Sequence, residues 1–219
     1  IAVIITDFIQ GVFVNVTFFA LVVYLVFVFD WETIFAALAT APADASLINP
    51  FETSHVEDFN VWYVLIGIVG LIYGKMSWQG TQAYNSSATS AHEAKMGQVL
   101  TNWRENPWKL FVLIVPVIAY TVLHHPDFAA QAGAVNELLA RTDSETIRNQ
   151  LRGPAVLVTM LPVGLLGAFA AVMLTAFVST HDTYLHSWGS IFIQDVVLPF
   201  RKKKLTPKQH VGLLRWSIL

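Results

Sequence analysis

The chain has 219 residues, of which 55% are hydrophobic and 13% are charged, and its formal net charge is −2. Soluble domains have about 25% charged residues, so this composition excludes an ordinary soluble domain. The chain lacks the basic surplus expected for a nucleic-acid partner, and without cysteine it can form neither disulfides nor cysteine-based metal sites.

Two uncharged stretches set the fold class. The first, between Asp7 and Asp30, has 22 residues, and the second, between Arg152 and Asp182, has 29. A membrane-spanning helix needs about 20 such residues. The sequence therefore predicts an all-α polytopic membrane protein that uses the lipid bilayer as its solvent. Because the chain begins at Ile1 rather than Met, we also expect residues 1–219 to be an internal fragment of one transmembrane domain.

The first predicted membrane helix covers about 3–29. Its many Val and Phe residues favour a strand in water, but a lone strand in lipid would leave its backbone groups unsatisfied. Asp7 and Gln10 are three residues apart and therefore share a helix face. Asp7 has two interpretations: a carboxylate stabilised by the helix dipole at the water boundary, or a functional group inside the membrane.

The loop over 30–60 contains six acidic residues and no Lys or Arg, and 31–38 is predicted as a short helix at the membrane interface. The second predicted membrane helix covers about 61–84. Its stretch from Gly74 to Gly80 is polar and rich in glycine, which membrane proteins tolerate where the backbone lines a cavity or is buried in protein. For Lys75 the alternative to lining a cavity is a side chain that extends its ammonium group to the membrane interface.

The remaining helices are predicted from their apolar patterns and from the residues that bound them. The polar segment 85–107 is predicted as a loop with a short helix, since Ser90 and Glu93 match a capping box. Further membrane helices are predicted over about 108–124 and about 154–197, a surface helix over 135–151, and the start of another helix from about 212. The helix from 154 is too long for one straight crossing, because 29 residues already span about 43 Å. It either projects beyond the bilayer or breaks near its polar cluster.

Basic residues predict the orientation of these helices. The segment after the second helix has three Lys or Arg residues by Lys109 and the segment after the fourth has five, whereas the loop 30–60 has none. The positive-inside rule therefore places 85–107 and 200–211 in the cytoplasm, if the protein lies in the cell membrane. Asp7 and the polar end of the 154–197 helix then lie at similar depth.

That polar end is the main candidate for chemistry. Ser179, Asp182, Thr183 and His186 occupy one face of a helix, with Ala176 and Thr180 beside them. Hydroxyl and carboxylate oxygens suit a hard cation such as Na⁺. The alternative is a polar helix end whose hydroxyls bond back to the preceding turn. A membrane metal enzyme using Asp182 and His186 is a third interpretation, but a transition-metal site would need further ligands, and none is assigned.

Three motifs resemble the sodium/solute symporter family, which carries sugars, proline, pantothenate and iodide. The segment 6–10, Thr-Asp-Phe-Ile-Gln, is similar to the Thr-Asp-x-x-Gln that opens the family's fifth core helix. Trp78-Gln79 and the segment 93–97 resemble the end of the sixth core helix and its cytoplasmic turn. The segment 176–195 resembles the eighth core helix. The resemblance covers essentially the whole chain and implies part of a fold of two inverted five-helix repeats.

The resemblance also implies ion sites. The family's shared sodium site uses the positions of Ala176, Ser179 and Thr180, together with carbonyls of a first core helix that lies outside this chain. Some members have an accessory site that joins the positions of Asp7, Asp182 and Thr183. Asp182 is a departure, because a hydroxyl is common at that position. A second carboxylate would strengthen binding of a second Na⁺, or would take up a proton.

The solute site is less closely matched. Tyr73, Lys75, Trp78 and Gln79 are the candidates for lining it, and Lys75 weakly favours an anionic solute. Many members have Gln-Arg where this chain has Ala83-Tyr84, and the aromatic pair of the sugar carriers is missing near Gly74. A sugar is therefore not carried over as the solute.

The resemblance implies a sodium-coupled symporter of a small solute that works by alternating access, with Na⁺ as coupling ion and no enzymatic activity. Sodium would stabilise the outward-open state, and inward opening would weaken the ion site. Coupling requires that the ion bind the two states differently. The alternative from another class is a membrane sensor or regulatory domain that keeps the scaffold without transport.

Overall fold

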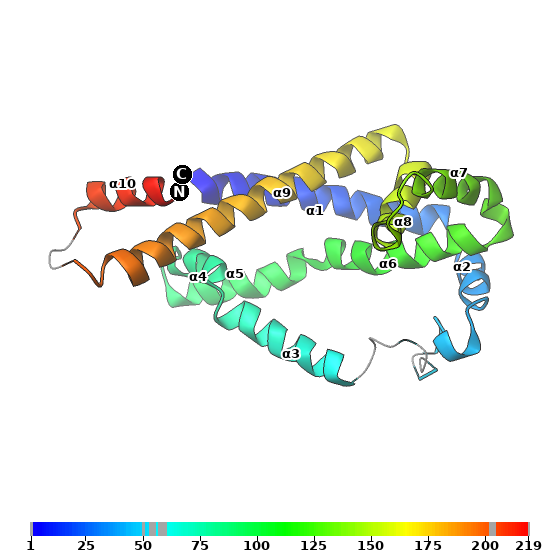
Figure 1. Cartoon of the computed structure of the whole chain (residues 1–219), viewed down its shortest axis with the longest axis horizontal. Coiled ribbons are helices and arrows are strands. Elements are labelled where there is room, and N and C mark those ends of the chain that lie inside the picture. Colours follow the sequence, from blue (N-terminus) through cyan, green and yellow to red (C-terminus); the bar gives the residue numbers. More distant parts are fainter. Residues whose placement is uncertain (1, 50, 53–55, 57–60, 202–204, 219) are drawn as a thin grey trace. The chain divides into compact units, whose positions relative to one another are not determined.

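The computed structural model describes residues 2–49, 51–52, 56, 61–201 and 205–218, and these residues form helices without strands (Figure 1). The all-α prediction is therefore confirmed. The α-helices are α1 Ala2–Val28, α2 Trp31–Leu38, α3 Val61–Met76, α4 Gln79–Ser86, α5 Ala91–Arg104, α6 Asn106–His124, α7 Ala129–Leu139, α8 Glu145–Met160, α9 Val163–Ile191 and α10 Pro207–Ser217. Short 3-10 helices cover Ala43–Ala45 (η1) and Pro126–Phe128 (η2), and a π-helix (η3) covers Phe192–Val197.

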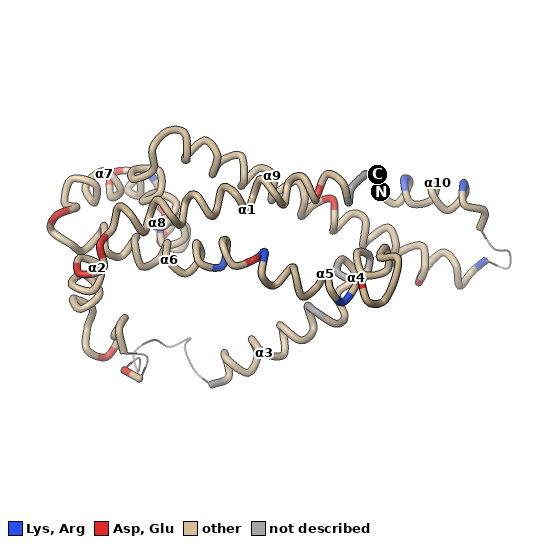
Figure 2. Tube along the Cα trace, turned by 180° about the vertical axis from the view of Figure 1, so that it is seen from behind, with Lys and Arg blue, Asp and Glu red and all other residues tan. Residues whose placement is uncertain are grey.

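Three helical stretches of the described chain are long and apolar enough to cross a membrane: Ile5–Val28, Ala91–His124 and Val163–Val197. Charged residues are sparse along α1 and α9 in Figure 2. The apolar helix Trp62–Gly74 is shorter. The first span agrees with the prediction over 3–29, and α2 confirms the short helix over 31–38.

The structure divides the helix predicted over 61–84. α3 ends at Met76 and α4 begins at Gln79, because Trp78 has an extended backbone with φ −73° and ψ 124°. The irregular backbone therefore lies within the Gly74 to Gly80 stretch, as the composition of that stretch predicts. Most of the polar segment 85–107 is also helical rather than a loop, since α5 covers Ala91–Arg104 and Ser90 accepts a hydrogen bond from the amide of Glu93.

The predicted start of the fourth membrane helix at Pro154 is wrong. Pro154 lies inside α8, and the chain breaks at Leu161, whose φ of −80° and ψ of 137° are the extended geometry favoured before a proline. α9 therefore begins after Pro162 and continues through the hydroxyl cluster to Ile191 without a break. Rather than breaking near the polar cluster, the helix continues beyond Ile191 into η3.

Two helix boundaries near the surface also differ from the prediction. The single surface helix over 135–151 is two helices, because the Ser144 side chain caps a new start by accepting the amide of Ile147. α10 begins at Pro207 rather than near 212, because Thr206 and Gln209 form a reciprocal capping box.

The described residues form two compact units, and one comprises 11–64 and 100–172. Its core joins α1, α2, α6, α7 and α8 with the start of α9. Phe18 and Phe111 meet at 5.0 Å between ring centroids, and the Tyr24 hydroxyl donates to the Met160 carbonyl at 3.0 Å. Its largest fully buried side chains are Leu21, Leu25, Phe29, Ile118, Val122, Val135, Val156, Val172 and Thr121.

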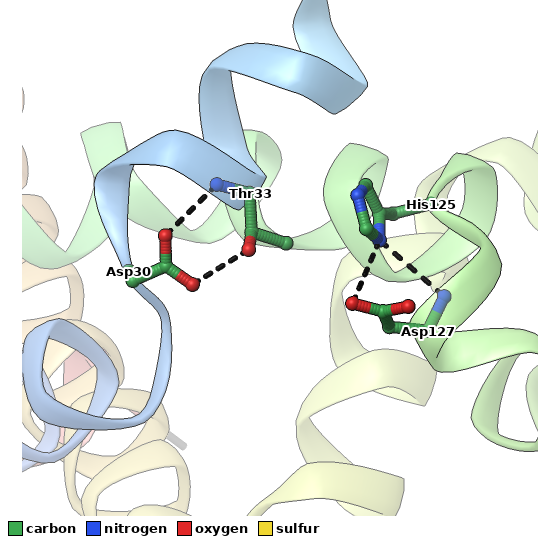
Figure 3. Close-up of polar contacts among 4 residues, drawn as sticks. All are labelled: Asp30, Thr33, His125 and Asp127. Atoms are coloured by element: carbon green, nitrogen blue, oxygen red, sulfur yellow. Dashed lines mark hydrogen bonds and ion pairs between the residues drawn. The ribbon is translucent and has the colours of Figure 1, made fainter.

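Two local caps fix helix starts in this unit (Figure 3). Asp30 caps α2: its carboxylate accepts the Thr33 hydroxyl at 2.6 Å and the Thr33 amide at 2.9 Å. The hydroxyl, followed by the amide, holds the pKa of the Asp30 carboxyl below its ordinary value of 3.8. His125 caps η2, since its Nδ1 accepts the amide of Asp127 at 3.3 Å and lies 3.6 Å from the Asp127 carboxylate.

The other unit comprises 1–10, 65–99 and 173–219. It brings the first turns of α1, the break between α3 and α4, and the polar half of α9 into one body. The motif residues of the sequence therefore fall within one unit.

Leu25→Ala tests the core of the first unit. Leu25 has 0% exposure, so its truncation leaves a cavity, and we expect a loss of at least about 2 kcal/mol of folding free energy. Phe27→Ala on the same helix is the control, because Phe27 is 87% exposed. The measurement is the thermal unfolding midpoint in detergent, and equal midpoints for the two variants would contradict this packing.

Asp30 makes the capping of α2 dependent on pH. A carboxyl with a lowered pKa stabilises the fold above its ordinary value of 3.8 and loses that contribution as pH falls through its folded value. We expect amide exchange in 31–38, corrected for intrinsic rates, to lose protection below about pH 4 in the wild type. Asp30→Asn also caps helices but cannot ionise, so its protection should not change with pH. The same pH dependence in both proteins would contradict the assignment.

Candidate functional site

The Asp7 carboxylate is the meeting point of three helices. Ser179 of α9 donates its hydroxyl to Oδ1 at 3.1 Å. Tyr84 of α4 donates its phenolic hydroxyl to Oδ2. Both carboxylate oxygens on α1 are thus bound by residues from elsewhere in the sequence, and the three side chains define the site, called here the Asp7 site.

Close packing of α4 on α9 supports this site. Gly80 is buried, and a Cβ at this position would lie 2.9 Å from the Thr183 methyl carbon and 3.0 Å from the Trp78 ring. Thr183 turns its hydroxyl away and donates it to the Ser179 carbonyl at 3.0 Å. The absence of a side chain at Gly80 therefore allows α4 to approach α9 closely enough for Tyr84 to reach Asp7.

The two hydrogen-bond donors to Asp7 among the described residues, Ser179 and Tyr84, are neutral. Among the described residues, no Lys or Arg forms an ion pair with Asp7. Hydroxyl groups stabilise a carboxylate by hydrogen bonding but leave its charge uncompensated. A cation or a proton is what would neutralise this charge, so the arrangement suits a site that takes up one of them.

Gln10 adds an oxygen one turn after Asp7. Its Oε1 is buried and has no hydrogen-bond partner in the described part of the chain. Residues three apart lie on the same helix face. A buried amide oxygen without a donor is unusual and suggests a missing ligand, and such oxygens are ligands for hard cations.

The predicted ion-site residues separate into two groups on α9. Ser179 and Thr183 are half-buried, whereas Ala176, Thr180 and Asp182 are exposed. Asp182 bonds to none of the other described site residues. The structure therefore brings Asp7 together with Ser179 directly, and with Thr183 through the Ser179 carbonyl.

The predicted solute-lining residues lie around the α3–α4 break. Trp78 contacts Tyr184 of α9, with ring centroids 5.9 Å apart and planes tilted by 58°. Gln79 is exposed at the start of α4, and Tyr73 is 62% exposed on α3. The Lys75 side chain lies outside the described residues. Trp78 thus connects this break to the polar half of α9.

The histidines of the cluster show other roles. His181 has Nδ1 2.8 Å from the Phe177 carbonyl oxygen, so this nitrogen donates to the backbone, and its ring packs on the Phe177 ring at 4.2 Å. His186 is exposed. Over the described residues, no three His, Asp or Glu side chains are grouped to hold a metal ion.

Tyr84, Gly80 and Tyr184 are the site residues that sequence reasoning missed. The sequence shows Ala83-Tyr84 only as a departure from Gln-Arg. The available signal for Tyr84 was chemical: its phenol, in place of the guanidinium of the arginine found in many family members, keeps a hydrogen-bond donor and removes the charge.

The comparisons with known proteins place the chain at family level. The family described as "Sodium:solute symporter family" matches residues 1–219, the whole chain. No curated protein and no solved structure matches the chain.

Gly80→Ala tests the close approach of α4 to α9. The added Cβ meets a β-branched threonine with a restricted rotamer and a bulky tryptophan ring, so we expect a loss of about 1–3 kcal/mol of stability. Gly70→Ala is the control, since a Cβ there meets nothing within 4 Å. Thermal unfolding in detergent measures both variants. A Gly80→Ala midpoint at or above that of Gly70→Ala would show that the approach is not required.

Proposed function

The chain belongs to the sodium:solute symporter family, and from this premise we propose that it couples sodium binding at α9 and the Asp7 site to the movement of a small solute. At family level it is an integral membrane protein of a transporter family, with sodium implied as the coupling ion. The observation that carries the proposal is the bond between Ser179 and Asp7, which links two helices through an oxygen-rich site.

The primary sodium site comprises Ala176, Ser179 and Thr180 in this proposal. Residues i, i+3 and i+4 share a helix face, and a hydroxyl oxygen has two lone pairs for an ion even while it donates its proton. Ser179 can therefore bind sodium and hold Asp7 at once. Sodium at this position stabilises the outward-open state, and inward opening separates the ligands and releases the ion with the solute.

A second cation or a proton occupies the Asp7 site, with Thr183 and Asp182 nearby on α9. The carboxylate of Asp7 has neutral partners, which favours uptake of positive charge. Asp182 would raise the proton affinity of Asp7 if both were charged at short range. The site thus serves as the accessory position of the transport cycle.

The solute binds beside the α3–α4 break, where Tyr73, Lys75, Trp78 and Gln79 are proposed to line its path. Interrupted membrane helices provide free backbone groups for solutes. The Trp78–Tyr184 contact supports this position, because it connects the break to the helix that carries the proposed sodium site.

In the proposed topology, 85–107 and 200–211 face the cytoplasm of a cell membrane. The loops at the other ends of these helices carry acidic residues. α2 packs on α6, and just after α2 the Thr40 hydroxyl lies 3.4 Å from the Tyr120 hydroxyl of α6. The loop after α1 and the end of α6 are therefore neighbours within one unit, which supports their common side.

Sodium-dependent uptake by the full-length protein tests the function. In cells or proteoliposomes supplied with a panel of radiolabelled small solutes, we expect one solute to accumulate when an inward sodium gradient is present. The double variant Ser179→Ala, Thr180→Ala should lower the apparent sodium affinity at least about tenfold, since it removes two oxygen ligands. Thr159→Ala is the matched control, because its hydroxyl donates to the carbonyls of Ala155 and Val156 in its own helix.

Normal sodium dependence in the double variant would refute the site assignment. Sodium binding without uptake of any solute would instead favour the sensor or regulatory domain.

A further inference from the structure

We propose that the Tyr84 hydroxyl competes with the cation for the Asp7 carboxylate, and so sets the affinity of the Asp7 site. This inference rests on the proposed function and assigns a role to a residue outside the predicted ion ligands. Its observation is the pair of bonds on Asp7, in which Tyr84 occupies Oδ2 while Ser179 occupies Oδ1.

The two hydroxyls differ in what they can do when a cation arrives. A serine hydroxyl rotates about one bond, so Ser179 can turn its hydrogen away and offer a lone pair to the ion. The phenolic hydrogen of Tyr84 prefers the plane of its ring, and it points at Oδ2 in the present geometry. A cation that binds Oδ2 in the direction of this hydrogen therefore displaces the phenol, whereas it retains Ser179.

The local structure allows this displacement. Tyr84 belongs to the eight-residue helix α4, which follows the break at Ser77 and Trp78, and its side chain is 39% exposed. Gly80 lies close to Thr183 of α9 at the start of α4, and at its end Asn85 accepts a hydrogen bond from the Gln98 side chain of α5 at 3.1 Å. The phenol therefore leaves Asp7 by rotation of the Tyr84 side chain.

An oxygen is available to replace the phenol. Gln10 has a buried Oε1 with no partner among the described residues, and it shares the Asp7 face of α1. A cation at Asp7 thus gains the carboxylate, the Ser179 oxygen and the Gln10 oxygen. In the ion-free state the Tyr84 hydroxyl keeps the carboxylate hydrogen-bonded, which avoids the cost of an unsatisfied charge.

The consequence is a lower affinity of the Asp7 site for cations. A cation that approaches Oδ2 from this direction replaces the bond between Tyr84 and the carboxylate, and a bond to a charged group is stronger than a neutral one. Occupancy of the site is therefore coupled to the orientation of the Tyr84 side chain on α4, the helix that directly follows the proposed solute-binding break.

Binding of ²²Na⁺ to the purified full-length protein, without solute, tests the inference. We expect Tyr84→Phe to bind sodium about tenfold more tightly than wild type, equivalent to about 1.4 kcal/mol. Tyr24→Phe is the matched control, because it removes a tyrosine hydroxyl bonded at 3.0 Å to a carbonyl in the other unit. Its sodium affinity should equal that of wild type. Tyr84→Leu repeats the removal if the phenylalanine variant does not fold.

A double-mutant cycle assigns the effect to Asp7. In an Asp7→Asn background, Tyr84→Phe should leave sodium affinity unchanged, a result that a general structural effect would not produce. Unchanged or weaker binding in the single Tyr84→Phe variant would overturn the inference and, if weaker, make Tyr84 a ligand. Wild-type protein that binds no sodium would contradict the proposed function itself.

Discussion

A carboxylate on an otherwise apolar helix is the constraint on which the site depends. A lone charge in an apolar environment costs several kcal/mol unless it is paired or hydrogen-bonded. Asp7 meets this requirement with hydroxyls from α9 and α4. Because those donors are neutral, they satisfy the oxygens without adding a positive charge.

The rest of the unit makes that arrangement geometrically accessible. The extended backbone at Trp78 ends α3 and starts α4, and Gly80 then lets α4 lie against Thr183 of α9. Thr183 bonds to the Ser179 carbonyl one turn earlier. Packing, helix interruption and the hydrogen bonds on Asp7 are therefore parts of one arrangement.

Hydropathy predicted the helical class and the long apolar helix over 3–29, because uncharged runs in lipid have few alternatives to a helix. Asp7 and Ser179 were identifiable as polar groups in apolar stretches. Their direct contact was not, since helical periodicity gives a face but does not specify which helix packs against it. Tyr84 was missed for the same reason: its partner is 77 residues away. The helix start expected at Pro154 was wrong, because the break lies at Leu161, whose extended backbone precedes Pro162.

The most direct measurement is thiol bridging between positions 7 and 179, in a full-length background without other cysteines; this chain itself has none. In the variant Asp7→Cys, Ser179→Cys, the account predicts that one mercuric ion bridges the two thiols of a single molecule and protects both from a maleimide. Two thiols that each react freely with maleimide after mercury treatment would contradict the meeting of α1 and α9 at Asp7.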